Sequence, residues 1–135
     1  MKLHYALLCD YAFLSVDRKV NIIGVFETIN AQKFPVIHPK FVIVGSVAPS
    51  KKSFKMSLDI LEKDNGTSVL QDVHERDVNL PQEQGQNFNF IVEVINTNFT
   101  KPGLYGVEIK IDGKVIGEIS LRLTENKLNA LGVPS

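Results

Sequence analysis

Histidine, cysteine and carboxylate side chains are the residues of this sequence whose chemistry suits metal binding or proton transfer. His4, His38 and His74 fall in separate predicted segments, and Cys9 is the only cysteine. A zinc site needs three or four ligands that converge on the ion. These residues do not have ligand spacing, so we predict neither a metal site nor another cofactor.

Asp10 is the polar residue that most needs an explanation, because it interrupts an otherwise apolar strand at residues 3–14. Burying an unpaired carboxylate is energetically costly. We therefore expect Asp10 to lie at a bulge, to accept a hydrogen bond, or to be exposed where the strand is irregular. A structural role is favoured over a catalytic one.

No catalytic arrangement is visible elsewhere in the sequence. Ser46, Ser53 and Ser57 lie in no nucleophile motif, and the glycines do not form a phosphate-binding loop. We predict no catalytic residue and expect that the protein is not an enzyme.

Composition narrows the class of protein further. The 135 residues are 44% apolar and 22% charged, which is typical of one soluble globular domain spanning residues 1–135. Fifteen basic and fifteen acidic side chains cancel, which argues against a nucleic-acid partner, since such proteins usually carry a basic face. No stretch approaches the roughly 20 apolar residues of a membrane span, and a single cysteine suits a reducing compartment. We therefore expect a cytoplasmic protein without a membrane or nucleic-acid partner.

The segments that must position any functional residue are mostly strands. Residues 3–14 and 20–29 predict a hairpin around the charged turn at 15–19. Their apolar residues occupy both alternating faces, so we expect both strands at the centre of a sheet or beneath a covering element. The two prolines within 32–39 predict a crossover loop.

The remaining segments complete an all-β pattern. We predict further strands at 40–47 and 54–60, an edge strand within 69–78, a strand from residue 88, and a closing hairpin around Asp112 and Gly113. About eight strands at this spacing predict a two-layer antiparallel β-sandwich, immunoglobulin-like or jelly-roll-like, with residues 124–135 as a tail.

The register of the closing hairpin follows from burial. Placing the apolar residues of 105–109 opposite those of 115–121 puts them on one face, and a one-residue slip would mix the faces. This register favours a three-residue loop in which Gly113 is left-handed and forms a bulge.

Several motifs resemble an uncharacterised bacterial family that is catalogued as a domain of unknown function. They are residues 6–12 (ALLCDYA), 19–26 (KVNIIGVF), Phe34-Pro35, residues 102–105 (PGLY) and Asp112-Gly113. The resemblance implies a β-sandwich and brings no activity or catalytic residue with it.

The second apolar face of several strands points to a function. If alternate residues of these strands face the core, the others form an apolar outer face that a soluble monomer rarely leaves open. We therefore predict a non-enzymatic interaction or assembly module that forms a twofold homodimer, or binds an unknown protein partner, through a sheet face. The possible interface consists of Ile23, Val25, Ile91 and Ile95.

Two alternatives remain open. The tail, apolar at residues 128–133, would cover part of this face without a second copy. A carbohydrate- or small-ligand-binding sandwich is the second functional class, although the absence of Trp removes the usual aromatic platform.

Overall fold

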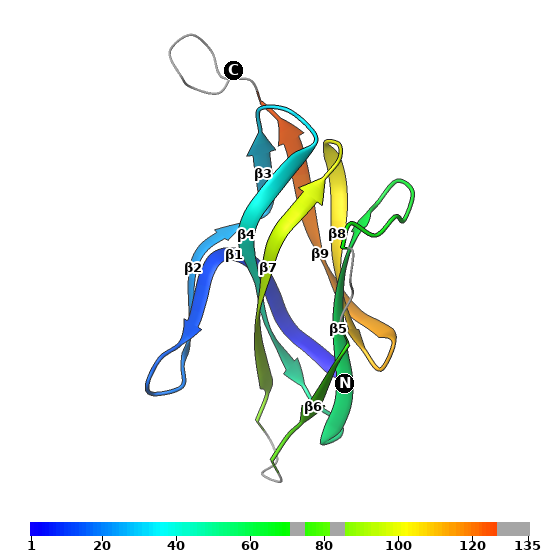
Figure 1. The fold of residues 1–135 in the computed structure, drawn as a ribbon. Coiled ribbons are helices and arrows are strands. Elements are labelled where there is room, and N and C mark those ends of the chain that lie inside the picture. The colour runs from blue at the N-terminus through cyan, green and yellow to red at the C-terminus, as the bar shows by residue number, and fades with distance from the viewer. Residues whose placement is uncertain (71–74, 82–85, 127–135) are drawn as a thin grey trace.

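The computed structural model describes residues 1–70, 75–81 and 86–126, which form two β-sheets packed face to face (Figure 1). The four-stranded sheet has the order β2-β1-β4-β7, and the five-stranded sheet has the order β3-β9-β8-β5-β6. The predicted all-β sandwich is confirmed. Its nine strands are β1 (Lys2–Leu14), β2 (Val20–Phe26), β3 (Thr28–Ala31), β4 (Val36–Ala48), β5 (Ser53–Glu62), β6 (Arg76–Asn79), β7 (Phe88–Phe99), β8 (Gly103–Ile111) and β9 (Lys114–Glu125).

The topology is of the immunoglobulin type rather than that of a jelly roll. In immunoglobulin domains the first, second and fifth strands share one sheet, and the third, sixth and seventh share the other. Strands β1, β4 and β7 correspond to the first set, and β5, β8 and β9 to the second, with β6 added beside β5. The β2 strand is therefore an extra strand on the edge of this framework.

One pair of strands departs from the predicted antiparallel arrangement. β3 runs parallel to β9, with Thr28 opposite Arg122 and Ala31 opposite Glu125. The chain leaves β2 at Phe26, crosses to the other sheet and enters it alongside β9. This crossing divides the predicted strand 20–29 into β2 and β3, which explains the ninth strand.

The main core lies between the two sheets and follows the predicted alternation. Phe54, Met56, Leu58 and Ile60 of β5 are buried, as the sequence pattern indicates. They share one apolar cluster with residues of the opposite sheet, including Phe41 and Phe90.

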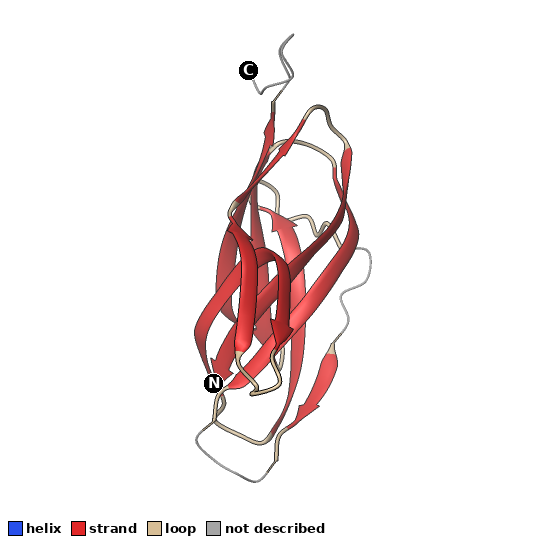
Figure 2. Ribbon diagram, turned by 90° about the vertical axis from the view of Figure 1, so that its left-hand side faces the viewer, coloured by secondary structure: helices blue, strands red, loops and turns tan. Residues whose placement is uncertain are grey.

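A second apolar cluster lies on the outer face of the four-stranded sheet. Cys9, Ala12, Val42 and Val44 form its buried centre, and Leu7, Val20, Ile22 and Ile91 pack against it. The outer half of the β1–β2 hairpin supplies Ala12, Val20 and Ile22. Figure 2 shows this hairpin lying in front of the sheet. The hairpin therefore covers the face that the sequence suggested would be open.

Of the two predicted placements, the centre of a sheet or beneath a covering element, the first holds for β1 but not for β2. β1 lies between β2 and β4, whereas β2 is at the edge of its sheet. The apolar residues of β2 reflect packing onto a second layer, not a place in the middle of the sheet.

Three predicted boundaries also change. Residues 36–39 belong to β4, where Pro39 lies opposite Asn96, a position with φ of 52° at which the β4–β7 ladder is interrupted. Proline is tolerated there because a bulge needs no ladder hydrogen bond.

Thr124 and Glu125 belong to β9, and the predicted cover at 128–133 lies outside the described residues. Of the edge strand predicted at 69–78, residues 76–78 belong to β6, which pairs with β5, and residues 69 and 70 lie in no strand.

The closing hairpin keeps the predicted register but not the predicted loop. Ile109 lies opposite Gly117, and Tyr105 lies opposite Leu121. The loop has two residues, Asp112 and Gly113, with φ of 50° and 81°. Two positive φ values are what a tight hairpin turn requires. The bulge lies within β9 instead, where the register shifts between Ile109 and Lys110.

We predict that the Cys9 thiol of the folded protein resists modification. Its side chain is fully buried beneath the hairpin, and burial raises the pKa of the thiol, so little reactive thiolate forms near neutral pH. A colourimetric thiol reagent should label Cys9 only at the rate of unfolding. A Val115→Cys variant in a Cys9→Ala background, with an exposed thiol, should label at once. Equal labelling rates would contradict the covering role of the hairpin.

Candidate functional site

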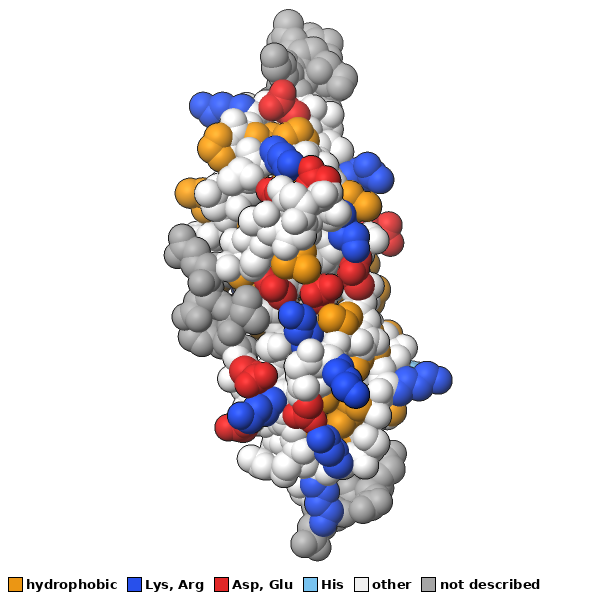
Figure 3. All heavy atoms as spheres, turned by 90° about the vertical axis from the view of Figure 1, so that its right-hand side faces the viewer, with side chains coloured by type: hydrophobic (Ala, Val, Ile, Leu, Met, Phe, Trp, Pro, Cys, Tyr) orange, Lys and Arg blue, Asp and Glu red, His pale blue; other side chains and the backbone are white. Residues whose placement is uncertain are grey.

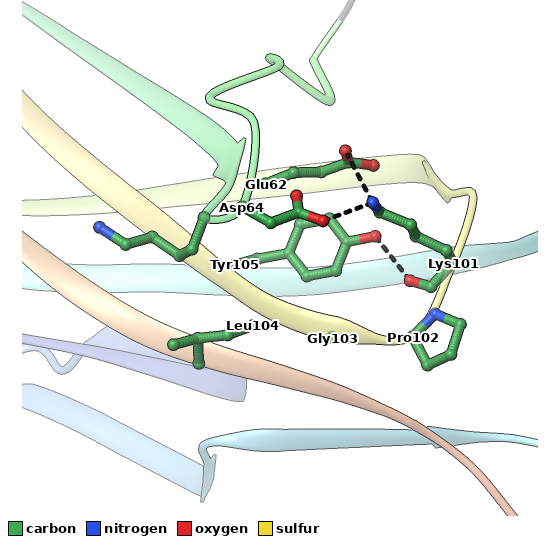
Figure 4. A pocket seen from close by; sticks show the side chains of 8 residues that line it. Glu62, Asp64, Lys101, Pro102, Gly103, Leu104 and Tyr105 are labelled. Atoms are coloured by element: carbon green, nitrogen blue, oxygen red, sulfur yellow. Dashed lines mark hydrogen bonds and ion pairs between the residues drawn. The ribbon is translucent and has the colours of Figure 1, made fainter.

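A pocket bordered by several charged side chains lies at the end of the sandwich where β7 crosses to β8. A cavity of about 320 Å³ is bordered by the end of β5, the following turn and the first residues of β8. Figure 4 shows Glu62, Asp64, Lys101 and Tyr105 arranged around it. The sequence does not predict this cluster, because its residues come from two distant segments without a recognisable spacing.

Glu62 is a buried carboxylate with several partners. Its Oε2 accepts a hydrogen bond from Asn65 Nδ2 at 2.8 Å, and its Oε1 accepts one from Thr100 Oγ1 at 3.1 Å. Lys101 Nζ lies 3.9 Å from Glu62 Oε2 and donates a hydrogen bond of 2.6 Å to Asp64 Oδ2. The negative charge at Glu62 is thus compensated, as a buried charge requires.

Tyr105 fixes the corner between the two sheets. Its hydroxyl donates a 2.7 Å hydrogen bond to the carbonyl oxygen of Lys101, four residues earlier, and its ring packs edge-on against Phe99. A tyrosine at the start of the equivalent strand makes the same kind of contact in immunoglobulin-type sandwiches. The side chain therefore holds the crossing in place.

The protonation of this cluster favours a structural role. Burial raises the pKa of Tyr105. The hydrogen bond with Lys101 lowers the pKa of Asp64, and the same bond raises the pKa of Lys101. A general acid or base works best with a pKa near the operating pH, and all three groups move away from neutrality. The hydrogen bonds of the Glu62–Tyr105 cluster connect the end of β5 to the crossing from β7 to β8.

A second cleft, of about 420 Å³, lies beside the first and shares Glu62 with it. It is lined by residues 67–70 and 95–98, among them Thr97, whose side chain is only 4% exposed. The Thr97 hydroxyl has no hydrogen-bond partner within the described part of the chain. An unpaired buried hydroxyl is unusual, and it makes this cleft the better candidate for a small polar ligand.

Exposed apolar residues gather on the β1–β2 hairpin. Tyr11 lies opposite Ile23 in the ladder, so their side chains share one face of the hairpin with Phe13. These three side chains are between 37% and 54% exposed, and the rings of Tyr11 and Phe13 lie 5.5 Å apart. We call this set the hairpin face.

The outer surface of the five-stranded sheet has a different character. Figure 3 shows basic and acidic side chains interspersed on the side of the molecule where this sheet lies. Ion pairs on this sheet include Lys63 with Glu118, whose charged atoms lie 2.8 Å apart, and Lys110 with Glu108, at 3.9 Å. Such a solvated, mixed surface lacks the apolar patch typical of an interface.

The predicted interface residues separate into two groups. Ile23 lies on the hairpin face, Val25 is exposed opposite Cys9 in the ladder, and Ile95 is exposed on the outer face of β7. Ile91, also on the outer face of β7, is half-buried because it packs against the second apolar cluster. Ile91 therefore contributes to the support of the hairpin.

Asp10 is exposed opposite Gly24, where the β1–β2 ladder is interrupted. Gly24 has φ of 74°, and a Cβ atom at this position would overlap the Asp10 side chain. Of the three placements expected for Asp10, the structure shows the exposed one at a strand irregularity.

Neither a cluster of metal-ligand side chains nor a membrane-spanning helix is found in the part of the chain that the structure describes. Within residues 1–70, 75–81 and 86–126, no three histidine, cysteine or acidic side chains are grouped as a metal site would require. The same residues contain no helix of the length and hydropathy needed to cross a membrane.

We predict that Tyr105→Phe destabilises the protein by about 1 kcal/mol, because the carbonyl of Lys101 loses its buried donor. Urea denaturation measures this change. Tyr11→Phe is the matched control, since the Tyr11 side chain is half exposed, and it should leave the unfolding midpoint unchanged. Equal midpoints for the two variants would show that the corner does not depend on this hydrogen bond.

Comparison with solved structures gives a distant likeness. The alkylpurine DNA glycosylase AlkC of Pseudomonas fluorescens, bound to DNA containing an abasic site analogue, aligns over 91% of this chain and 30% of its own. The sequence identity is 11% and the TM-score is 0.48, a level at which the likeness carries no argument. No curated protein matches the sequence.

The sequence itself matches a family, over a range that includes nearly all of the sandwich. The sequence model described as "Family of unknown function (DUF6941)" matches residues 4–124, from near the start of β1 almost to the end of β9. This match confirms the resemblance to an uncharacterised family. The chain, with its covering hairpin and polar corner, is a member of the DUF6941 family.

Proposed function

We propose that this protein is a non-enzymatic assembly module that forms a homodimer through its β1–β2 hairpin. The distribution of exposed apolar side chains carries the proposal. Of the ten large apolar side chains that are exposed among the described residues, six lie between residues 11 and 25. Scattered apolar residues are normal on a protein surface, whereas a concentrated patch marks an interaction site.

The size of this surface suits a dimer. A fully buried aromatic side chain removes about 150–250 Å² from water, so half-exposed side chains of similar size each leave roughly 100 Å² accessible. The six side chains, which lie on both faces of the hairpin and in its turn, expose roughly 600 Å² per copy, and a dimer that buried all of them would remove about 1,200 Å² from water, the lower end of stable interfaces. A twofold dimer would present the same surface from both copies.

The support beneath the hairpin favours the same function. Ala12, Val20 and Ile22 anchor it to Val42 and Val44 through the second apolar cluster. A surface held in place before binding loses less conformational entropy when a partner docks.

We predict that the wild-type protein scatters light at twice its 15.1 kDa chain mass at micromolar concentration. Ile23→Lys should give the monomer mass while remaining folded, because the exposed position accepts a charge in the monomer but not inside an interface. Val115→Lys is the matched control. Val115 is exposed to a similar degree, 50% against 54% for Ile23, but lies on the other sheet, so this variant should remain dimeric.

A wild-type protein that remains monomeric at about 100 micromolar would contradict the proposal, because the dissociation constant of the dimer would then exceed this concentration. A dimer that survives Ile23→Lys would place the interface elsewhere.

A second candidate function is binding of a small neutral sugar or polyol in the cleft at Thr97. The buried Thr97 hydroxyl, which has no partner among the described residues, favours it. The cleft also contains the side chains of Asn96, Asn98 and Thr100. Amides and hydroxyls can donate and accept hydrogen bonds, as sugar hydroxyls require.

For this candidate, we predict that one member of a panel of neutral sugars raises the melting temperature. A ligand at 100 times its dissociation constant stabilises the folded state by about 2.7 kcal/mol. Thr97→Val should abolish the increase, and Thr28→Val, on the exposed side of β3, should not. No increase with any sugar, or an increase that persists in Thr97→Val, would exclude the cleft as the site.

A further inference from the structure

The turn after β5 contains the one Asn-Gly pair of the sequence, Asn65-Gly66. In such a pair the backbone nitrogen of the glycine can attack the side-chain amide carbon of the asparagine, because glycine has no side chain to obstruct the approach. Both residues are exposed, and a Cβ atom built at Gly66 would meet no neighbour within 4 Å. Solvent therefore has access to this pair.

The reaction needs only water as a second reactant. The Gly66 nitrogen gives up its proton to solvent and bonds to Asn65 Cγ, the Cγ–Nδ2 bond breaks, and ammonia leaves. Water then opens the resulting cyclic succinimide at either carbonyl. The products are an aspartate or an isoaspartate at position 65, and no oxidant or reductant takes part.

The folded turn restrains each of the groups that would react. The Gly66 N–H donates a hydrogen bond of 2.8 Å to the carbonyl oxygen of Glu62. Asn65 Nδ2 donates one of 2.8 Å to Glu62 Oε2, and Asn65 Oδ1 accepts one of 2.8 Å from the Thr67 N–H. To react, the Gly66 nitrogen must lose a proton that it now donates, and the Asn65 side chain must turn away from Glu62.

Glu62 can hold the turn because its own position is fixed. Its side chain is buried, and it contacts Thr100 and Lys101, the second of which faces it in Figure 4. Hydrogen bonds to an ionised acceptor are among the stronger ones in proteins. The reactivity of Asn65 thus depends on the crossing from β7 to β8, which is distant from it in the sequence.

We propose that Asn65 is a deamidation site that Glu62 keeps unreactive in the folded protein, and that its product weakens the corner around Glu62. The amide at position 65 now donates to a carboxylate, whereas a carboxylate at this position only accepts. Two like charges at this separation disfavour each other. Deamidation therefore removes the contact that prevents it. This inference goes beyond the proposed dimer and does not depend on it.

Peptide mass spectrometry after incubation at mildly alkaline pH measures the deamidated fraction of Asn65. Wild-type protein unfolded in guanidinium chloride gives the rate of the unrestrained pair. The folded protein should react at least about tenfold more slowly, the factor expected from one hydrogen bond to a charged group. Glu62→Ala, with its folding checked by circular dichroism, should react about tenfold faster than the folded wild type for the same reason.

Two control variants isolate the contact with Glu62. Glu118→Ala also removes a carboxylate from an ion pair, but Glu118 pairs with Lys63 rather than with the Asn65 side chain. Ile109→Ala lowers the stability of the whole domain through a core position that is inaccessible to water. Both variants should deamidate at the rate of the folded wild type.

A double-variant comparison tests the effect of the product. Asn65→Asp reproduces one of the two products and should lower the unfolding midpoint in urea. In a Glu62→Gln background the same substitution should not lower it, because no second carboxylate then faces residue 65.

Each part of the inference has an outcome that overturns it. An unfolded chain that does not deamidate at Asn65 would remove the site itself. Equal rates for Glu62→Ala and the folded wild type would overturn the protection by Glu62, and so would an increase of the same size in Ile109→Ala, because the reaction would then follow global unfolding. An unchanged midpoint for Asn65→Asp would overturn the weakening of the corner. The mass measured by light scattering enters none of these results, so the proposed dimer stands or falls separately.

Discussion

The structure depends on one constraint, which is that the central strand β4 is apolar on both faces. Phe41 and Ile43 face the other sheet, and Val42 and Val44 face outward, yet all four side chains are essentially inaccessible to water. A two-layer sandwich provides cover for one face of each sheet only. The β1–β2 hairpin supplies the missing cover, and β1 can extend past β4 to form it because the strand has 13 residues. The extra strand, the buried cysteine and the exposed hairpin face all follow from this need.

Polar contacts stabilise the crossing from β7 to β8, whereas apolar contacts stabilise the β1–β2 hairpin. At the crossing from β7 to β8, Glu62 and Tyr105 satisfy buried backbone and side-chain groups and so hold the two sheets together. At the hairpin, the inner side of the ribbon is used for packing and the outer side is left to solvent. The polar corner is therefore occupied by its own contacts, whereas the hairpin leaves apolar side chains exposed.

The sequence predicted the elements that depend on local patterns. Alternation located β5, and the Asp112-Gly113 pair located the last turn. The edge position of β2 could not be predicted, because a strand beneath a second layer and a strand in the middle of a sheet carry the same apolar pattern. The same ambiguity explains Ile91 and Ile95, which point to one side of β7 although the hairpin cluster covers only Ile91. The corner around Glu62 escaped prediction because Glu62 and Lys101 meet only after the sheets have packed.

The parallel pairing of β3 with β9 has a consequence for how the chain folds. The side chains of Asn30 and Thr124 share a hydrogen bond although they are 94 residues apart in the sequence. During synthesis the early strands must therefore wait for β9 before the five-stranded sheet can close, and β3 remains without its neighbour until then. Chains dominated by such distant contacts fold on the order of milliseconds to seconds. Until β9 arrives, β8 lacks one of its two neighbours, and an unpaired strand edge of this kind makes an incomplete chain prone to association.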